Sequence, residues 1–298
     1  MMQMPTIRSA LLAFLLGCSP ADGGPNFGGS SPDLCRVVSR GVALPPEVEE
    51  ASGAELSART PGVVWTHNDA GWGPELFAVA PDGSLAGKVR VAGADNEDWE
   101  DLARGPCPTG QCLHIGDIGD NGADRDEVVV YRIPEPLPGD ARSAPAERFE
   151  ARYPEGPRDA EGLFVLPSGE VYLVSKGDRV PVELFRFHLR PEGVATLEPV
   201  RTLSADTLPV HERITGATAT PDGSHVLLRS HDSLHIYRTQ NLLSDEPLVP
   251  PQRVDLRPLN EVQGEGVAIG ADGEVVLTSE GKGKKTPATL ARLACTFR

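Results

Sequence analysis

Short runs of β-branched, aromatic and other apolar residues recur along the chain, and each ends in a small polar cluster. Five runs share this form, at a spacing of roughly 50 residues: VVWTHNDAG (63–71), LHIGDIGDN (113–121), VYLVSKGDR (171–179), VLLRSHDSL (226–234) and VVLTSEGKG (275–283). Short segments of this composition, without a helical period, indicate β-strands. The regular spacing indicates one supersecondary unit repeated along the chain.

Every unit contains further apolar segments on both sides of this run. The segments that precede it are ASGAELSA (51–58), DWEDLARG (98–105), DAEGLFVL (159–166), RITGATAT (213–220) and QGEGVAIG (263–270). A third segment follows the run, and turns such as Pro81-Asp82-Gly83 separate the strands. Each unit also has a fourth strand with a less marked sequence pattern. Four strands in each repeated unit are typical of a propeller blade. The sequence therefore predicts an all-β, five-bladed β-propeller over residues 34–298, with six blades as the alternative.

The fifth unit lacks an outer strand, whereas residues 35–40 form a strand that belongs to no unit. We expect this N-terminal strand to complete the fifth blade and close the ring, which removes a free sheet edge. A disulfide between Cys35 and Cys295 would lock the closure, and Cys107 and Cys112 flank a hairpin that a local disulfide would fit. The alternative is four buried free thiols.

Residues 1–18 resemble a bacterial lipoprotein signal peptide. Arg8 precedes an apolar run that is too short to span a bilayer, and the run ends in a Leu-Leu-Gly-Cys box at Cys18, the predicted lipidation site. An ordinary secretory signal is the alternative. Residues 19–33 are rich in Gly, Ser, Pro and Asp and predict a flexible tether. We therefore expect a lipid-anchored protein of the cell envelope: the outer membrane or periplasm if the host is Gram-negative, or the cell surface.

The charge balance narrows the choice of partner. Asp and Glu number 43 against 28 Lys and Arg, a formal net charge of −15. This composition argues against a nucleic-acid partner, which requires basic residues, and is compatible with binding a hard cation. No phosphate-binding loop, nucleophile elbow or zinc-protease motif occurs. We expect a monomer whose membrane contact is limited to the lipid anchor.

In a propeller, the innermost strands surround a central channel, and the loops at one end form its mouth. The position that enters the innermost strand carries Ser52, Glu100, Glu161, Thr215 and Glu265. We assign the end of the second strand to Asn68, Asp117, Lys176, Ser230 and Glu280. Carboxylates gathered near one axis repel unless protons, basic groups or a cation compensate. We therefore predict that Ca²⁺ or Mg²⁺ binds to oxygen ligands from Glu100, Glu161, Glu265, Asp117 and Glu280. A solvated acidic funnel with salt bridges is the alternative.

Three residues near this mouth are the candidate catalytic residues. His67 could act as an acid or base, and Lys176 or Arg229 could stabilise negative charge that develops on a small anionic or ester substrate. A different class of function remains open: a non-catalytic scaffold that binds a protein or glycan partner through the same face. Trp72, in a loop, offers an aromatic surface for such a partner.

Two stretches of the chain resemble repeats of the phytase-like esterase and SdiA-regulated propellers. They are DAEGLFVLPSGEVYLVSKGD and the similar QGEGVAIGADGEVVLTSEG of a later unit. The resemblance covers two or three short stretches. It implies a Glu-lined, often calcium-loaded channel and hydrolysis of phosphate or ester bonds. The matching positions are Glu161, Glu265 and Glu280 and, by repeat equivalence, Glu100 and Asp117. The fourth unit departs from the pattern with Thr215 and Ser230, and the first with Ser52 and Asn68.

Overall fold

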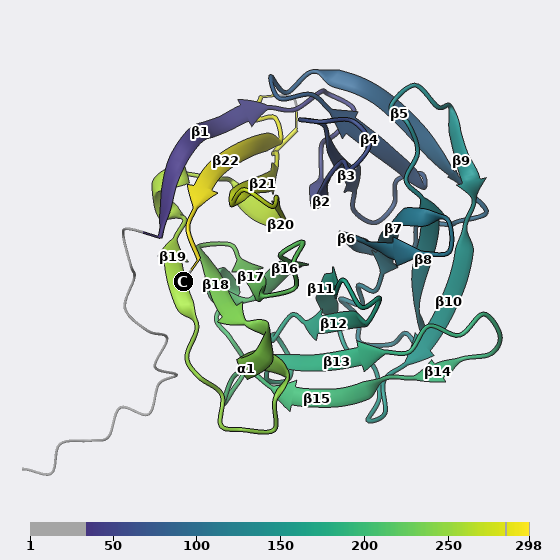
Figure 1. The fold of residues 1–298 in the computed structure, drawn as a ribbon, viewed down its shortest axis with the longest axis vertical. Coiled ribbons are helices and arrows are strands. Elements are labelled where there is room, and N and C mark those ends of the chain that lie inside the picture. Colours follow the sequence, from purple (N-terminus) through teal and green to yellow (C-terminus); the bar gives the residue numbers. More distant parts are fainter. Residues whose placement is uncertain (1–33, 284, 298) are drawn as a thin grey trace, which may run out of the picture.

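The computed structural model describes residues 34–283 and 285–297. The expected signal peptide, the lipidation at Cys18 and the tether lie outside the described residues. The described chain forms five sheets arranged around a central axis, as Figure 1 shows. This confirms the predicted five-bladed propeller.

The innermost strand of every blade is the first strand of its repeat unit. Blade 1 contains β2 (Ala51–Leu56), β3 (Val64–Asn68), β4 (Glu75–Val79), β5 (Leu85–Ala92) and β9 (Arg142–Pro145). Blade 2 contains β6 (Trp99–Cys107), β7 (Gly110–Asp117), β8 (Val128–Pro134), β10 (Glu147–Arg152) and β14 (Ala195–Thr196). Blade 3 contains β11 (Ala160–Val165), β12 (Val171–Ser175), β13 (Glu183–Phe187) and β15 (Glu198–Thr202). Blade 4 contains β16 (Ile214–Ala219), β17 (His225–Ser230), β18 (Ser233–Arg238) and β19 (Gln252–Asp255). Blade 5 contains β20 (Gln263–Ile269), β21 (Glu274–Glu280), β22 (Thr289–Cys295) and β1 (Cys35–Ala43).

Two short outer strands go beyond the predicted blades. Strand β9 pairs parallel to β5, and β14 pairs parallel to β10, so each is a fifth strand supplied by a later stretch of chain. Because each covers a sheet edge, it removes a site for unwanted strand pairing. The helical elements are short: η1 (Val210–Glu212), α1 (Thr239–Leu243) and η2 (Arg257–Leu259). Among the described residues, no helix has the length and apolar character needed to cross a bilayer.

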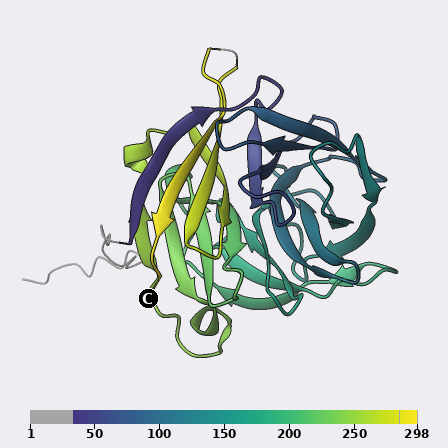
Figure 2. The same cartoon turned by 45° about the horizontal axis from the view of Figure 1, so that its top comes forward.

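The ring closes as expected, with β1 running antiparallel beside β22 at the outer edge of blade 5 (Figure 2). Cys35 lies opposite Cys295, and a disulfide joins them. A second disulfide joins Cys107 and Cys112 across the hairpin between β6 and β7.

Five hydrophobic clusters form the core, one between each pair of neighbouring blades. Trp65 of blade 1, for example, shares a cluster with Leu113 and Tyr131 of blade 2. Leu44 and Phe77 share another with Val276 of blade 5, across the ring closure. Each blade therefore buries both faces of its sheet against its neighbours. This packing holds the ends of the innermost strands in fixed positions around the axis.

Candidate functional site

Five carboxylates from three blades gather at one end of the innermost strands. We call Asp69, Asp98, Glu100, Asp159 and Glu161 the acidic cluster. In one group, ligand oxygens of Asp69, Asp98 and Glu100 lie within 4.8 Å of one another, and in a second the same holds for Glu100, Asp159 and Glu161. Glu100 belongs to both groups, so the five side chains form one continuous site.

Local backbone irregularities orient the two central glutamates. The pairing of β6 with β7 shifts register between Trp99 and Asp101, and that of β11 with β12 shifts between Ala160 and Gly162. Glu100 and Glu161 are the residues inside these two bulges. Because a bulge re-aims the residue that it contains, both side chains leave the ordinary alternation of the strand. Both glutamates are about 4% exposed, although both are acidic residues.

Burial and mutual repulsion raise the pKa values of Asp98, Glu100 and Glu161. Burial raises the pKa of Glu161 to about 7, although nearby Lys176 opposes the shift. Burial, with repulsion from Asp69, Asp159 and Glu161, raises the pKa of Asp98 to about 7. Burial, with the charges of Glu161, Asp69 and Asp98, raises the pKa of Glu100 well above its usual range. The site therefore carries more acid groups than it can ionise without added positive charge.

Lys176 is a basic residue in direct contact with this site. Its Nζ lies 3.2 Å from Asp159 Oδ2 and also contacts Glu161 Oε1. Burial lowers the pKa of the ammonium, but the carboxylates of Glu161 and Asp159 outweigh this and raise it overall. Lys176 therefore stays charged, and its side chain remains 18% exposed toward the mouth.

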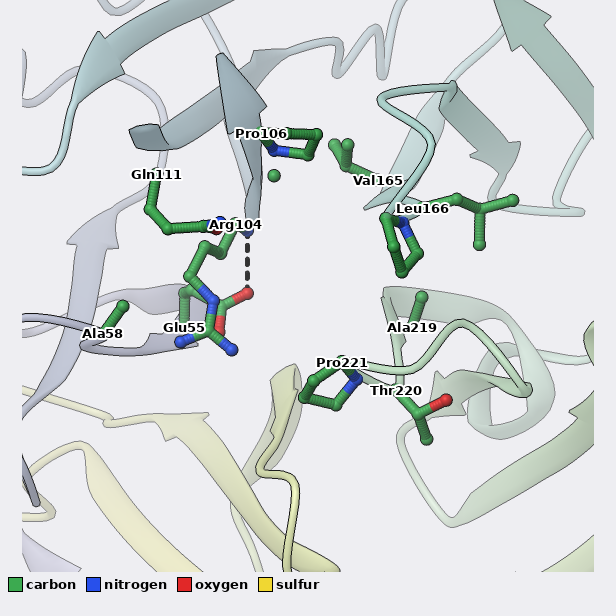
Figure 3. Close-up of a pocket in the computed structure, with 12 residues that line it drawn as sticks. Glu55, Ala58, Arg104, Pro106, Gln111, Val165, Leu166, Ala219, Thr220 and Pro221 are labelled. Atoms are coloured by element: carbon green, nitrogen blue, oxygen red, sulfur yellow. Dashed lines mark hydrogen bonds between the residues drawn. The ribbon is translucent and has the colours of Figure 1, made fainter. Parts of the chain in front are cut away.

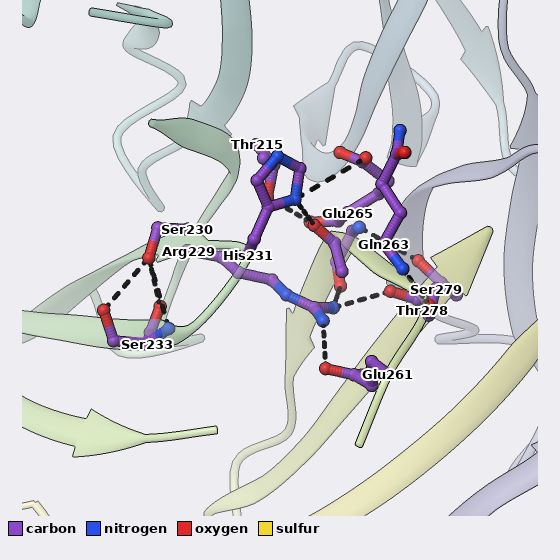
Figure 4. Close-up of polar contacts among 12 residues, drawn as sticks. Thr215, Arg229, Ser230, His231, Ser233, Glu261, Gln263, Glu265, Thr278 and Ser279 are labelled. Atoms are coloured by element: carbon purple, nitrogen blue, oxygen red, sulfur yellow. Dashed lines mark hydrogen bonds and ion pairs between the residues drawn. The ribbon is translucent and has the colours of Figure 1, made fainter. Parts of the chain in front are cut away.

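Glu265 and Glu280 extend the acidic surface toward blade 5 without joining the two ligand groups. Burial, followed by the charges of Glu161 and Glu280, raises the pKa of Glu265 well above its usual range. Burial and the charge of Asp69 raise that of Glu280 to about 7. His231 lies beside this extension, with Nδ1 4.0 Å from Glu265 Oε1 (Figure 4). Its Nδ1 also lies 3.1 Å from the Gly264 carbonyl oxygen.

The strand pairing changes the prediction of which residues at the end of each blade's second strand lie near the mouth. The residues paired with the entry to each innermost strand are Asn68, Asp117, Ser175, Ser230 and Ser279. The residues one place later are Asp69, Ile118, Lys176, His231 and Glu280. The expected ring took Lys176 and Glu280 from the second set and its other members from the first, and consecutive residues of an extended chain point to opposite sides. Asp69 and His231 therefore lie near the mouth in place of Asn68 and Ser230.

Asp117 makes structural contacts, and it belongs to neither of the two ligand groups found among the described residues. Its Oδ1 lies 2.9 Å from Arg125 Nη2 and accepts a 3.1 Å hydrogen bond from the Asp98 backbone N–H. Its Oδ2 accepts a bond from the Glu97 N–H. Asp117 thus holds the loop that carries Asp98, and we leave it out of the proposed ligand set.

Two candidate catalytic side chains have no surface to offer a substrate. His67 is fully buried, packs edge-on against Trp99 at 5.6 Å between ring centroids, and burial lowers its pKa to about 4. Arg229 is also fully buried; its Nη2 lies 2.6 Å from Glu261 Oε2 and its Nη1 donates to the carbonyls of Gly266 and Thr278 (Figure 4). We therefore leave both out of the proposed site.

Asp69, Asp98 and Asp159 are the cluster residues outside the ligand set predicted from the sequence. Asp98 stands two places before Glu100, as Asp159 stands two places before Glu161. An acid repeated at equivalent positions of two blades was therefore a usable signal. The equivalent residue of blade 1, Glu50, is also acidic.

A separate cavity of about 330 Å³ lies at the opposite ends of the innermost strands (Figure 3). Glu55 and Arg104 line it together with proline rings from the turns of blades 2 to 4. Glu55 accepts hydrogen bonds from the backbone N–H groups of Leu56 and Arg104, and burial raises its pKa to about 7. This cavity shares no lining residue with the acidic cluster.

The sequence matches no protein-family model and no curated protein. Among solved structures, the PQQ-bound form of aldose sugar dehydrogenase from Streptomyces coelicolor is similar, with a TM-score of 0.52 and 12% identity over 89% of this chain and 100% of that chain. A glucose dehydrogenase structure has a TM-score of 0.50 and 13% identity, covering 86% of this chain and 98% of that one. At such low identity the likeness is one of fold alone. The chain is therefore similar to known propellers, without a family assignment.

Proposed function

We propose that the acidic cluster binds a divalent cation, Ca²⁺ or Mg²⁺, and that the site hydrolyses a phosphoester or ester bond of a small anionic substrate. One observation carries the proposal: two groups of carboxylates share Glu100, with the ligand oxygens of each group within 4.8 Å of one another, and the group of Glu100, Asp159 and Glu161 is buried. The partial resemblance to phytase-like esterase repeats points to the same chemistry.

The residues present fit such a cation. All five side chains of the cluster offer carboxylate oxygen, the ligand that Ca²⁺ and Mg²⁺ prefer. Five carboxylates face one nearby ammonium, that of Lys176. A divalent cation would offset part of the remaining negative charge. The irregular arrangement suits Ca²⁺, which tolerates flexible geometry, better than Mg²⁺.

Each protein group has a role in this scheme. Glu100, Asp159 and Glu161 would hold the cation, and Asp69 and Asp98 would complete the ligand set. A bound divalent cation polarises a phosphoryl or carbonyl oxygen and lowers the pKa of water.

Two basic side chains supply the remaining functions. Lys176 donates to an anionic oxygen of the substrate. His231 takes the acid–base role first expected of His67. Its Nδ1 faces the Gly264 carbonyl and so carries the proton, which leaves Nε2 with a lone pair. Burial lowers the pKa of His231, so the ring is neutral at pH 7 and can accept a proton.

A second candidate function is glycan recognition at the same face. Trp72 is 38% exposed, and its Nε1 donates a 2.5 Å hydrogen bond to Glu50 Oε2. Burial, followed by the charges of Asp69 and Glu50, raises the pKa of Glu280, so Glu50 belongs to the same acidic surroundings. A fixed, part-exposed indole is a suitable surface for stacking a sugar ring.

The two disulfides support an extracytoplasmic location, because such bonds persist in oxidising compartments. Within that location, we propose a monomer anchored through lipid on Cys18.

Turnover on a panel of phosphoesters, esters and lactones, with Ca²⁺ or with chelator, tests the hydrolase. We expect Ca²⁺-dependent turnover that Glu161→Gln abolishes while the variant remains folded. The matched control is Glu192→Gln, on an exposed turn, which keeps wild-type turnover. Absence of turnover across the panel contradicts the hydrolase. Binding of oligosaccharides that Trp72→Ala removes would then support the glycan function.

A further inference from the structure

Asp101, the neighbour of Glu100 on β6, joins three blades through one carboxylate. It is fully buried. Its Oδ1 accepts a 2.8 Å hydrogen bond from the Leu102 N–H, and its Oδ2 accepts bonds of 2.8 and 2.9 Å from the N–H groups of Leu163 and Ala217. These donors lie on the innermost strands of blades 2, 3 and 4.

The other four blades carry glycine at the equivalent position: Gly53, Gly162, Gly216 and Gly266. Three of these glycines lie against the backbone of a neighbouring blade. A Cβ on Gly53 would lie 2.6 Å from the Leu102 nitrogen, one on Gly216 2.8 Å from the Glu265 oxygen, and one on Gly266 2.2 Å from the Ser52 oxygen. The innermost strands of blades 1, 4 and 5 thus approach a neighbouring blade too closely at this position to admit a Cβ.

Asp101 lies between the acidic cluster and the cavity on the opposite face. Along β6, it stands after Glu100 of the cluster and before Arg104 of the cavity.

We propose that Asp101 is a positioning residue for the acidic cluster. It fixes Glu100 through the chain, as its direct neighbour. It fixes Glu161 through the Leu163 N–H, two residues further along β11. Glu100 and Glu161 belong to one ligand group, so the bond from Asp101 to Leu163 sets the relative position of two oxygens that a cation must bridge. The test of this proposal by Ca²⁺ affinity rests on the proposed function.

Two substitutions separate positioning from bulk stability. Asp101→Gly removes all three acceptor bonds and introduces the residue that the other four blades carry. Asp101→Asn is the conservative variant, because its amide oxygen can still accept the N–H groups of Leu163 and Ala217, and only the bond from the Leu102 N–H is lost. The matched control is Glu135→Gln: Glu135 is also buried and accepts hydrogen bonds from Ser57, Ala58 and Trp65, outside the acidic cluster.

We expect Asp101→Gly to weaken Ca²⁺ binding by about tenfold or more, as is usual for residues that orient metal ligands, and Asp101→Asn to retain most of the affinity. Glu135→Gln should lower the melting temperature yet keep the Ca²⁺ affinity within about twofold, because distant sites act independently. Equal losses of Ca²⁺ affinity in Asp101→Gly and Glu135→Gln overturn the proposal. Failure of the wild-type protein to bind Ca²⁺ contradicts the proposed function instead.

A second readout needs no cation. Crystal structures of wild-type protein and Asp101→Gly, both in chelator, should show the Glu100 and Glu161 carboxylates displaced relative to each other in the variant. Unchanged carboxylate positions overturn the positioning role, whatever the affinity for Ca²⁺.

Discussion

The ammonium group of Lys176 lies 3.2 Å from the carboxylate of Asp159, and the same ammonium contacts Glu161. Asp159 and Glu161 also belong to one group of converging ligand oxygens. A lysine thus already occupies part of the surface that a cation would use, and the two positive charges repel.

Replacing Lys176 by Met separates cation binding from turnover. Loss of the ammonium removes repulsion toward the cation, so we expect about tenfold tighter Ca²⁺ binding, equivalent to about 1.4 kcal/mol. Turnover should nevertheless fall by about 100-fold, because the substrate anion loses its donor. Calorimetric titration and initial rates measure the two effects. Weaker Ca²⁺ binding in Lys176→Met contradicts the assigned arrangement.

Without a bound cation, the free energy of unfolding should decrease as the pH rises toward neutrality. The pKa of Asp98, Glu161 and Glu280 is raised to about 7 in the folded protein, chiefly by burial, and returns to about 4 in the unfolded chain. Between these values the folded state binds more protons, so the free energy of unfolding falls as pH rises.

In chelator, we therefore expect a lower melting temperature at pH 7.5 than at pH 5.5, with about 2–4 °C for each kcal/mol lost. Saturating Ca²⁺ should remove or reverse the difference, because cation binding displaces protons from its ligands. Thermal unfolding under the four conditions measures this. A melting temperature in chelator that rises over this interval contradicts the raised pKa values.

Arg229 provides a test of the corrected site. Its guanidinium neutralises buried Glu261, so Arg229→Gln should cost about 3–5 kcal/mol of stability by leaving a buried charge unpaired. Because the group does not reach the mouth, the folded fraction should keep wild-type affinity for Ca²⁺. Denaturant unfolding and titration check both points, and an affinity loss without destabilisation would restore Arg229 to the site.

The two disulfides should differ in their effects on stability. Cys35–Cys295 spans a sequence separation of 260, and Cys107–Cys112 one of 5. Restriction of the unfolded chain gives about 5 kcal/mol for the long loop and about 2 kcal/mol for the short one. Double Cys→Ser replacements, compared by denaturant unfolding, measure the difference. A larger loss for the short loop contradicts the view that the long disulfide closes the ring.

The blades were predictable because strand alternation, turn residues and spacing repeat together, and Cys35 and Cys295 marked the closure. Strands β9 and β14 were not predictable, because segments of four and two residues that add parallel to an outer edge leave no periodic signal.

At the site, Glu100 and Glu161 were found because the glutamate recurs at the entry of the innermost strand. The second ring was misassigned because a shift of one residue moves a side chain to the other side of a strand. Only the pairing partners of Asp117 and Ser230 reveal that shift.

Equilibrium dialysis against Ca²⁺, followed by metal analysis, gives the number of divalent cations bound to each chain. We predict one Ca²⁺ per wild-type chain, and none in a folded Glu100→Gln, Glu161→Gln double variant. A wild-type protein that retains no divalent cation, or a double variant that retains as much as wild type, contradicts this prediction.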